Sequence, residues 1–98
     1  MYTKTYGQTG RVCRVTFHLN AEMKARTVSL CGDFNEWDPE CNFMERSSDG
    51  SFSTSVMLHP GHQYRFRYLI DGQRWEVDGQ AEGYALNRLG GDDAVIMV

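Results

Sequence analysis

Two tryptophans stand just after turn signals, each at the end of a strand-like run. Trp37 closes the segment GDFNEW (residues 32–37), and Trp75 follows the segment DGQR (residues 71–74). An indole has a large flat apolar face and a single N–H donor, so it is suited to lie against the C–H face of a sugar ring. A lone tryptophan more often packs in a core, since this residue type is highly buried on average. Because both tryptophans follow turns, and Trp37 has polar neighbours, the pair favours an exposed stacking surface.

Arginines supply the hydroxyl-binding groups that such a surface needs. Arg65 and Arg67 alternate with aromatic residues along residues 64–70, so the guanidinium groups share one face of a strand and the rings share the other. Each guanidinium presents several N–H donors in a fixed fork. Interleaved aromatic and basic residues also occur in sites for single-stranded nucleic acid. Here the two residue types face opposite ways and the net charge is −3, so we expect no nucleic-acid partner.

Metal binding and catalysis find little support in the sequence. His59 and His62 flank a Pro-Gly turn, and Cys13, Cys31 and Cys41 show no spacing typical of metal ligands. Hydrolysis would need two carboxylates across a cleft, and a chain of this size has no second layer to build one. Neither a nucleophile-elbow motif nor a phosphate loop is present. We therefore expect a non-enzymatic protein without cofactor or metal.

Alternation with a period of two dominates the chain and predicts strands rather than helices. The 98 residues correspond to one domain. Turn signals such as Ser-Asp-Gly, His-Pro-Gly and Asp-Gly separate the alternating runs. We expect an all-β, immunoglobulin-like antiparallel β-sandwich of about seven short strands, without the immunoglobulin Cys–Trp–Cys signature. The expected strands cover residues 13–19, 27–31, 43–44, 52–58, 64–70, 74–77 and 94–98, and residues 78–93 are expected to be irregular.

The cysteine count and the apolar runs predict where in the cell the protein is located. Three cysteines are an odd number, which favours reduced thiols over a disulfide framework. The first residues contain no apolar stretch typical of a secretory signal, and the longest apolar run, residues 94–98, is far too short to span a bilayer. We expect a cytoplasmic protein with no membrane partner.

Four segments together resemble one known family. They are VTFHL (15–19), GDFNEWDP (32–39), YRFRYLIDGQRW (64–75) and NRLGGDDAVIMV (87–98), and they span nearly the whole chain in the order of the family. The chain is similar to the glycogen-binding domains of carbohydrate-binding module family 48, also called isoamylase early-set domains. Such domains occur in the beta subunit of AMP-activated protein kinase and ahead of the catalytic barrel in glycogen branching and debranching enzymes. The resemblance assigns residues 11–98 to the domain and leaves residues 1–10 as an N-terminal extension.

The resemblance also implies roles for individual residues. Trp37 and Trp75 match the two stacking platforms of the family. Arg67 stands where the kinase-type domains place a hydroxyl-binding lysine, and an arginine can also donate to sugar oxygens. Leu89 matches a leucine that contacts a sugar ring from the Gly-rich loop.

Asp93 is the clearest departure from the family pattern. It stands where the family usually has a sugar-binding asparagine, so two N–H donors are lost and a negative charge is added. Asp93 and Asn87 are nevertheless expected to bond sugar hydroxyls alongside Arg67. A further difference from the kinase-type loop is Arg74, between the Asp-Gly turn and Trp75.

Three hypotheses of function follow from the residues and the resemblance. In the first, the chain is a non-catalytic module that binds an α-1,4-linked glucan such as glycogen, starch or a malto-oligosaccharide. In the second, sugar affinity is lost, as the Asp93 departure indicates, and the chain is a protein-interaction module that associates with a glycogen-metabolising enzyme. In the third, the chain is the N-terminal piece of a glycoside hydrolase or branching enzyme. We favour the first.

Overall fold

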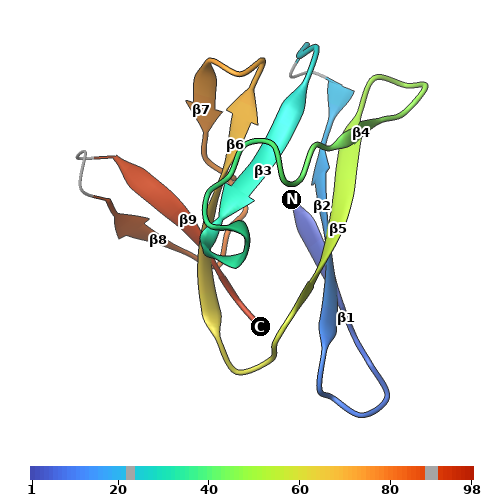
Figure 1. Cartoon of the computed structure of the whole chain (residues 1–98), viewed down its shortest axis with the longest axis vertical. Coiled ribbons are helices and arrows are strands. Elements are labelled where there is room, and N and C mark those ends of the chain that lie inside the picture. Colours follow the sequence, from blue (N-terminus) through green and yellow to red (C-terminus); the bar gives the residue numbers. More distant parts are fainter. Residues whose placement is uncertain (22–23, 88–90) are drawn as a thin grey trace.

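The structure, a computed structural model, describes residues 1–21, 24–87 and 91–98. Strands and the short 3-10 turn η2 (Asp33–Asn35) lie among these residues (Figure 1). The strands of the described residues are β1 (Tyr2–Tyr6), β2 (Cys13–Leu19), β3 (Val28–Gly32), β4 (Glu45–Arg46), β5 (Phe52–Leu58), β6 (Gln63–Ile70), β7 (Arg74–Glu76), β8 (Gly83–Leu86) and β9 (Asp92–Met97). In this part of the chain, no helix has the length and apolar character needed to cross a membrane.

The strands form two antiparallel sheets, which lie on the right and the left of Figure 1. Sheet A, on the right, has the strand order β1-β2-β5-β4. Sheet B has the order β3-β6-β9-β8. Along one edge of β6, β9 pairs with the first half of the strand and β7 pairs with the second half. This arrangement confirms the predicted all-β antiparallel sandwich.

The core lies between the sheets, where alternate residues of facing strands meet. On β2, Val15 and Phe17 are fully buried. Phe17 packs edge-on against Phe66 of β6, with ring centroids 5.0 Å apart. Successive side chains of a strand point to opposite faces, so the burial of Phe66 directs Arg65 and Arg67 to the outer face of sheet B.

Strand β8 corrects the prediction that residues 78–93 are irregular. It pairs with β9 along its whole length. The large side chains of β8, Tyr84 and Leu86, are exposed, whereas the half-buried positions hold only Gly83 and Ala85. The pattern therefore lacks the buried large residues by which a strand is recognised in a sequence.

Two further elements differ from the expected strand positions. Strand β1 pairs with β2, so part of the segment expected to precede the domain is hydrogen-bonded into sheet A. The short strand expected at residues 43–44 is reduced to one bridge between Phe43 and Ser29, and β4 follows it.

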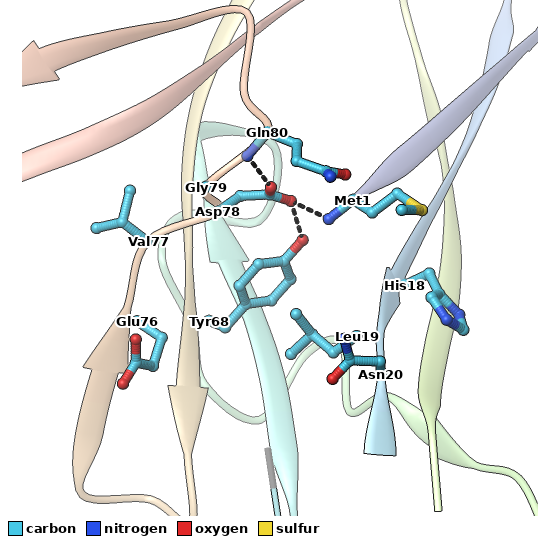
Figure 2. Close-up of a pocket in the computed structure, with 10 residues that line it drawn as sticks. All are labelled: Met1, His18, Leu19, Asn20, Tyr68, Glu76, Val77, Asp78, Gly79 and Gln80. Carbon is cyan, nitrogen blue, oxygen red and sulfur yellow. Dashed lines mark hydrogen bonds and ion pairs between the residues drawn. The ribbon is translucent and has the colours of Figure 1, made fainter. Parts of the chain in front are cut away.

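Asp78 is a buried carboxylate at the opening between the sheets (Figure 2). It accepts hydrogen bonds from the Tyr68 hydroxyl (2.7 Å), the N-terminal ammonium of Met1 (2.5 Å) and the backbone N–H of Gln80 (2.8 Å). Burial alone raises the pKa of this carboxyl, but the ammonium and hydroxyl donors outweigh burial and hold the pKa below its ordinary value. A hollow of about 330 Å³ lies beside these groups and is lined from both sheets, by Leu19 and Tyr68 among others.

Candidate functional site: a tryptophan groove on sheet B

A groove of about 750 Å³ lies on the outer face of sheet B. We call it the Trp groove. Its lining combines two indoles with charged, amide and aliphatic side chains: Asp33, Trp37, Arg65, Arg67, Trp75, Leu86, Asn87 and Asp93. Five of the six residues predicted as binding residues, all except Leu89, therefore lie in one groove. Leu89 lies outside the described residues, so its predicted contact has no structural account.

The two indoles form the apolar centre of the groove. The ring centroids of Trp37 and Trp75 are 6.4 Å apart, and the ring planes are inclined at 63°. Trp75 is 44% exposed, and Trp37 is half-buried. Residues from two distant segments thus present neighbouring aromatic faces at one surface rather than filling the core.

The turn after β3 is built to present Trp37. Asn35 holds this turn, because its side-chain oxygen accepts from the Gly32 N–H (3.0 Å) and its amide donates to the Leu30 carbonyl (2.8 Å). A Cβ at Gly32 would meet the Arg65 carbonyl oxygen at 2.5 Å, so this position requires glycine. The glycine and the asparagine of the GDFNEW motif are therefore structural residues of the turn.

The same turn contains two consecutive residues in the left-handed region. The φ angles of Glu36 and Trp37 are 57° and 59°. Non-glycine residues adopt this conformation at a cost of about 1 kcal/mol or more each, and they do so where the surroundings enforce it. Here the Trp37 N–H donates to the Gly32 carbonyl (2.9 Å) and closes the turn. The backbone direction at Trp37 is thus set by the turn.

Asp33 joins this turn to strand β6. One carboxylate oxygen accepts from the Trp37 indole N–H (Nε1–Oδ1, 3.0 Å), and the other accepts from the Arg65 backbone N–H (N–Oδ2, 2.8 Å). Sequence reasoning did not assign Asp33 to the site. Its place four residues before Trp37 in a turn is a weak signal, since many aspartates in such turns only cap backbone groups.

A hairpin positions Trp75. Asp71 and Gly72 have φ angles of 54° and 69°, as expected for an Asp-Gly turn between two strands. The Asp71 carboxylate accepts from the backbone N–H groups of Arg26 and Thr27 at 2.7 and 3.0 Å, and these bonds lower its pKa. In β7, Trp75 is paired with Leu69 of β6.

Asp93 is paired with arginines on the floor of the groove. The carboxylate is 2.9 Å from Arg67 Nε and 3.8 Å from Arg65 Nη1. Arg67 also donates from Nε and Nη2 to the Asp92 carbonyl, at 3.2 and 3.0 Å. The Asp93 side chain is only 8% exposed, whereas that of Arg65 is 47% exposed. The negative charge added at position 93 is therefore balanced by neighbouring guanidinium groups.

Asn87 connects this ion pair to the end of β8. Its amide donates to Asp93 Oδ1 (3.2 Å), and its oxygen accepts from the Gly91 N–H (3.1 Å). A Cβ at Gly91 would lie 2.8 Å from Arg67 Nη2, so glycine leaves room for the guanidinium. Leu86, at 70% exposure, adds an apolar side chain to the groove that sequence reasoning missed.

Metal chemistry finds no candidate site in the described part of the chain. No group of three or more His, Cys, Asp or Glu side chains is placed there to hold an ion.

Residues 15–91 match the family described as the glycogen recognition site of AMP-activated protein kinase. The chain belongs to this family. The match covers the turn that carries Trp37, the hairpin that carries Trp75 and strand β8. Membership confirms the predicted resemblance and places the chain among glycogen-binding modules.

Three curated proteins are similar to parts of this glycogen-recognition chain. The 1,4-alpha-glucan branching enzyme GlgB of Aquifex aeolicus is 40% identical over 68 residues, which cover 66% of the chain. Protein PTST homolog 2, chloroplastic, of Arabidopsis thaliana is 39% identical over 54 residues, or 55% of the chain. Protein FLOURY ENDOSPERM 6, chloroplastic, of rice has the same identity over the same length. In each case the match spans only 10% of the relative.

Proposed function

We propose that this chain is a non-catalytic module that binds α-1,4-linked glucans, such as glycogen or malto-oligosaccharides, in the Trp groove. The observation that carries the proposal is the pair of neighbouring indoles, with centroids 6.4 Å apart and planes inclined at 63°. Two non-coplanar faces suit consecutive rings of a curved α-1,4 chain. The glycogen-recognition family supports the same class of ligand.

The arginines provide N–H donors for sugar hydroxyls beside the two indoles. Arg65 is the more accessible donor, because its side chain is 47% exposed and its contact with Asp93 is long, at 3.8 Å. Arg67 is held at 2.9 Å by Asp93, and among the contacts of the described residues its Nη1 has no partner, so its N–H groups there are proposed to donate to a sugar oxygen. We assign Asp93 the role of orienting Arg67, which explains how a carboxylate fits where the family usually has an asparagine.

A second candidate function concerns a protein partner. A relative of the chain is a branching enzyme, and the match spans 10% of that enzyme. This similarity favours a module that brings a glycogen-metabolising enzyme to its glucan, with the chemistry carried out by the enzyme.

We also propose a cytoplasmic location for this function. The free thiols of Cys13, Cys31 and Cys41 support it, because reduced cysteines are typical of that compartment.

Retardation in native gels that contain glycogen tests the proposal. We expect wild type to be retarded, and Trp37→Ala and Trp75→Ala each to weaken the apparent affinity about tenfold or more, as loss of a central aromatic contact does. Phe43→Ala is the matched control, because Phe43 is an exposed aromatic residue that does not line the groove. Equal retardation of wild type and both tryptophan variants would contradict the proposal.

The salt dependence separates a neutral glucan from a charged ligand. Binding of an uncharged chain releases no counterions, so we expect retardation to change little when the salt concentration is raised. Release of reducing sugar from glycogen by the purified chain would contradict the non-catalytic part of the proposal.

A further inference from the structure

The Asp33 carboxylate occupies a position where strand β3 has just ended. The last pair of the β3–β6 ladder is Gly32 with Phe66, so the next partner of Arg65 would be the backbone of residue 33. That backbone turns away into η2, and the side chain of Asp33 accepts the Arg65 N–H instead, at 2.8 Å. The carboxylate thus replaces a backbone acceptor and is anchored to the central strand of sheet B.

The second oxygen of this anchored carboxylate holds the polar end of an indole. The Trp37 Nε1–H is the single hydrogen-bond donor of its ring, and it points to Asp33 Oδ1 at 3.0 Å. A side chain that pivots about its Cβ is fixed when its far end is bonded to a rigid element. The inclination of 63° between the two indoles therefore depends on the hydrogen bond from Trp37 to Asp33.

The backbone of the turn does not set this orientation by itself. Glu36 and Trp37 both lie in the left-handed region, and the backbone N–H of Trp37 is tied to Gly32. These features fix where the Trp37 Cβ stands, whereas rotation about the side-chain bonds is left to packing and to the indole N–H. Asp33 is the hydrogen-bond acceptor that the structure provides for this N–H.

We propose that Asp33 is a positioning residue that holds the Trp37 indole in its binding orientation before the glucan arrives. The inference rests on the proposed glucan-binding function. In this arrangement the Trp37 indole N–H is bonded to the protein, and the aromatic face of the ring is available to the sugar. The two Asp33 oxygens are assigned to protein donors, the Trp37 indole N–H and the Arg65 backbone N–H, so the inferred role is orientation of the indole rather than direct contact with a sugar hydroxyl.

The test compares Asp33→Ala and Asp33→Asn with wild type, first without glucan. In Asp33→Ala, we expect the Trp37 indole N–H to exchange with solvent faster and the circular-dichroism couplet of the two neighbouring indoles to weaken. Asn has one carbonyl acceptor for two donors, so we expect Asp33→Asn to lie between the two. If Asp33→Ala does not fold, Asp33→Asn carries the comparison.

Affinity for maltoheptaose is measured next on the same proteins. We expect the dissociation constant of Asp33→Ala to be about tenfold higher than that of wild type, the change typical of one lost charge-assisted hydrogen bond. Asp38→Ala is the matched control, because it removes an exposed carboxylate one residue after Trp37 that bonds only the Glu40 N–H among the described contacts. The control should keep the indole spectra and the affinity of wild type.

The outcomes separate positioning from direct contact and from failure of the proposed function. Weakened affinity with wild-type exchange and an unchanged couplet would show that Asp33 contacts the glucan, and would overturn the inference. Unchanged spectra together with unchanged affinity would overturn it as well. If Trp37→Ala and Trp75→Ala bind glucan like wild type, the proposed function fails, and the ligand-free spectra of the Asp33 variants still decide whether Asp33 positions the indole.

Discussion

At the scale of single residues, Asp93 and Arg67 form a matched pair on the floor of the Trp groove. An asparagine at position 93 would offer N–H donors, whereas the carboxylate offers only acceptors. Arg67 provides the planar fork that a carboxylate binds well, with Nε at 2.9 Å. The two differences from the kinase-type pattern therefore compensate each other within one contact.

A double-mutant cycle tests this coupling. We expect Asp93→Asn alone to lower the free energy of unfolding by about 1–3 kcal/mol, because it leaves the half-buried Arg67 without its charged acceptor. Arg67→Lys alone should also destabilise, since a lysine ammonium lacks the planar fork with which Arg67 donates to both Asp93 and the Asp92 carbonyl. The double variant should be more stable than the sum of the single changes by about 0.5–3 kcal/mol, measured by urea unfolding. Strict additivity would show that the pair is not coupled.

Thiol reactivity is a second property that single residues decide. Cys31 is fully buried, and burial, followed by the charge of Asp38, raises the pKa of its thiol to about 11. Cys41 is exposed, and Cys13 is buried. We expect a thiol reagent to modify one cysteine rapidly in the folded chain and the other two only after unfolding, since reaction needs an accessible thiolate. Cys41→Ser should remove the rapid phase; a rapid phase that persists would contradict this assignment.

At the scale of elements, the turn between β3 and β4 is the part that converts a sandwich edge into a binding surface. Its glycine approaches the Arg65 carbonyl too closely for a Cβ, at 2.5 Å, and its asparagine binds the end of β3. The turn thereby places Trp37 beside the hairpin that carries Trp75. A change in the turn is expected to affect both stability and the groove.

Gly32→Ala tests the role of the turn. Its Cβ would overlap the Arg65 carbonyl and the Phe34 ring, at 2.5 and 2.7 Å, so we expect a loss of about 1–3 kcal/mol in the free energy of unfolding and weaker glucan binding. Gly79→Ala is the control, because a Cβ there meets nothing within 4 Å. The control should be neutral or slightly stabilising. Equal stability of the two variants would contradict the close approach at Gly32.

Elements with strong alternation were the ones that the sequence could predict. In β2, β5 and β6 the large apolar residues recur at alternate positions and supply the core from one face, although β6 also buries Leu69 on its other face, and turn signals separate the strands. Strand β8 escaped prediction because its large residues are exposed. The Asp93–Arg67 contact was also beyond sequence reasoning, since it depends on the pairing of β6 with β9. The role of Asp33 depends likewise on where β3 ends against β6.

At the scale of the whole molecule, the buried Asp78 carboxylate links the stability of the sandwich to pH. Its pKa is lower in the folded chain than in the unfolded chain, where aspartate titrates near about 3.9. Its stabilising contribution is therefore fully present above that unfolded value and is lost as the pH falls through the lower folded value. Burial and the charge of Asp78 raise the pKa of the Tyr68 hydroxyl, so this hydroxyl keeps its proton and continues to donate it to Asp78.

Urea unfolding of Asp78→Asn at neutral and acidic pH tests this link. At neutral pH, we expect the variant to lose about 1–3 kcal/mol, the typical cost of removing a buried charged acceptor. In acid, the difference from wild type should shrink, because the wild-type carboxyl is then protonated and as uncharged as the amide of the variant. Glu45→Gln, on the exposed strand β4, controls for the loss of one charge. A difference from wild type that is independent of pH would contradict the lowered pKa.

Trp37 and Trp75 are proposed to form one platform for an α-1,4 glucan. The most direct test of this platform is a titration of the chain with maltoheptaose in which NMR follows the ring protons of both indoles together. We predict that the resonances of both rings move and that both titrations give the same dissociation constant. If saturating glucan moves the resonances of only one ring, or of neither, the two indoles do not form one binding platform.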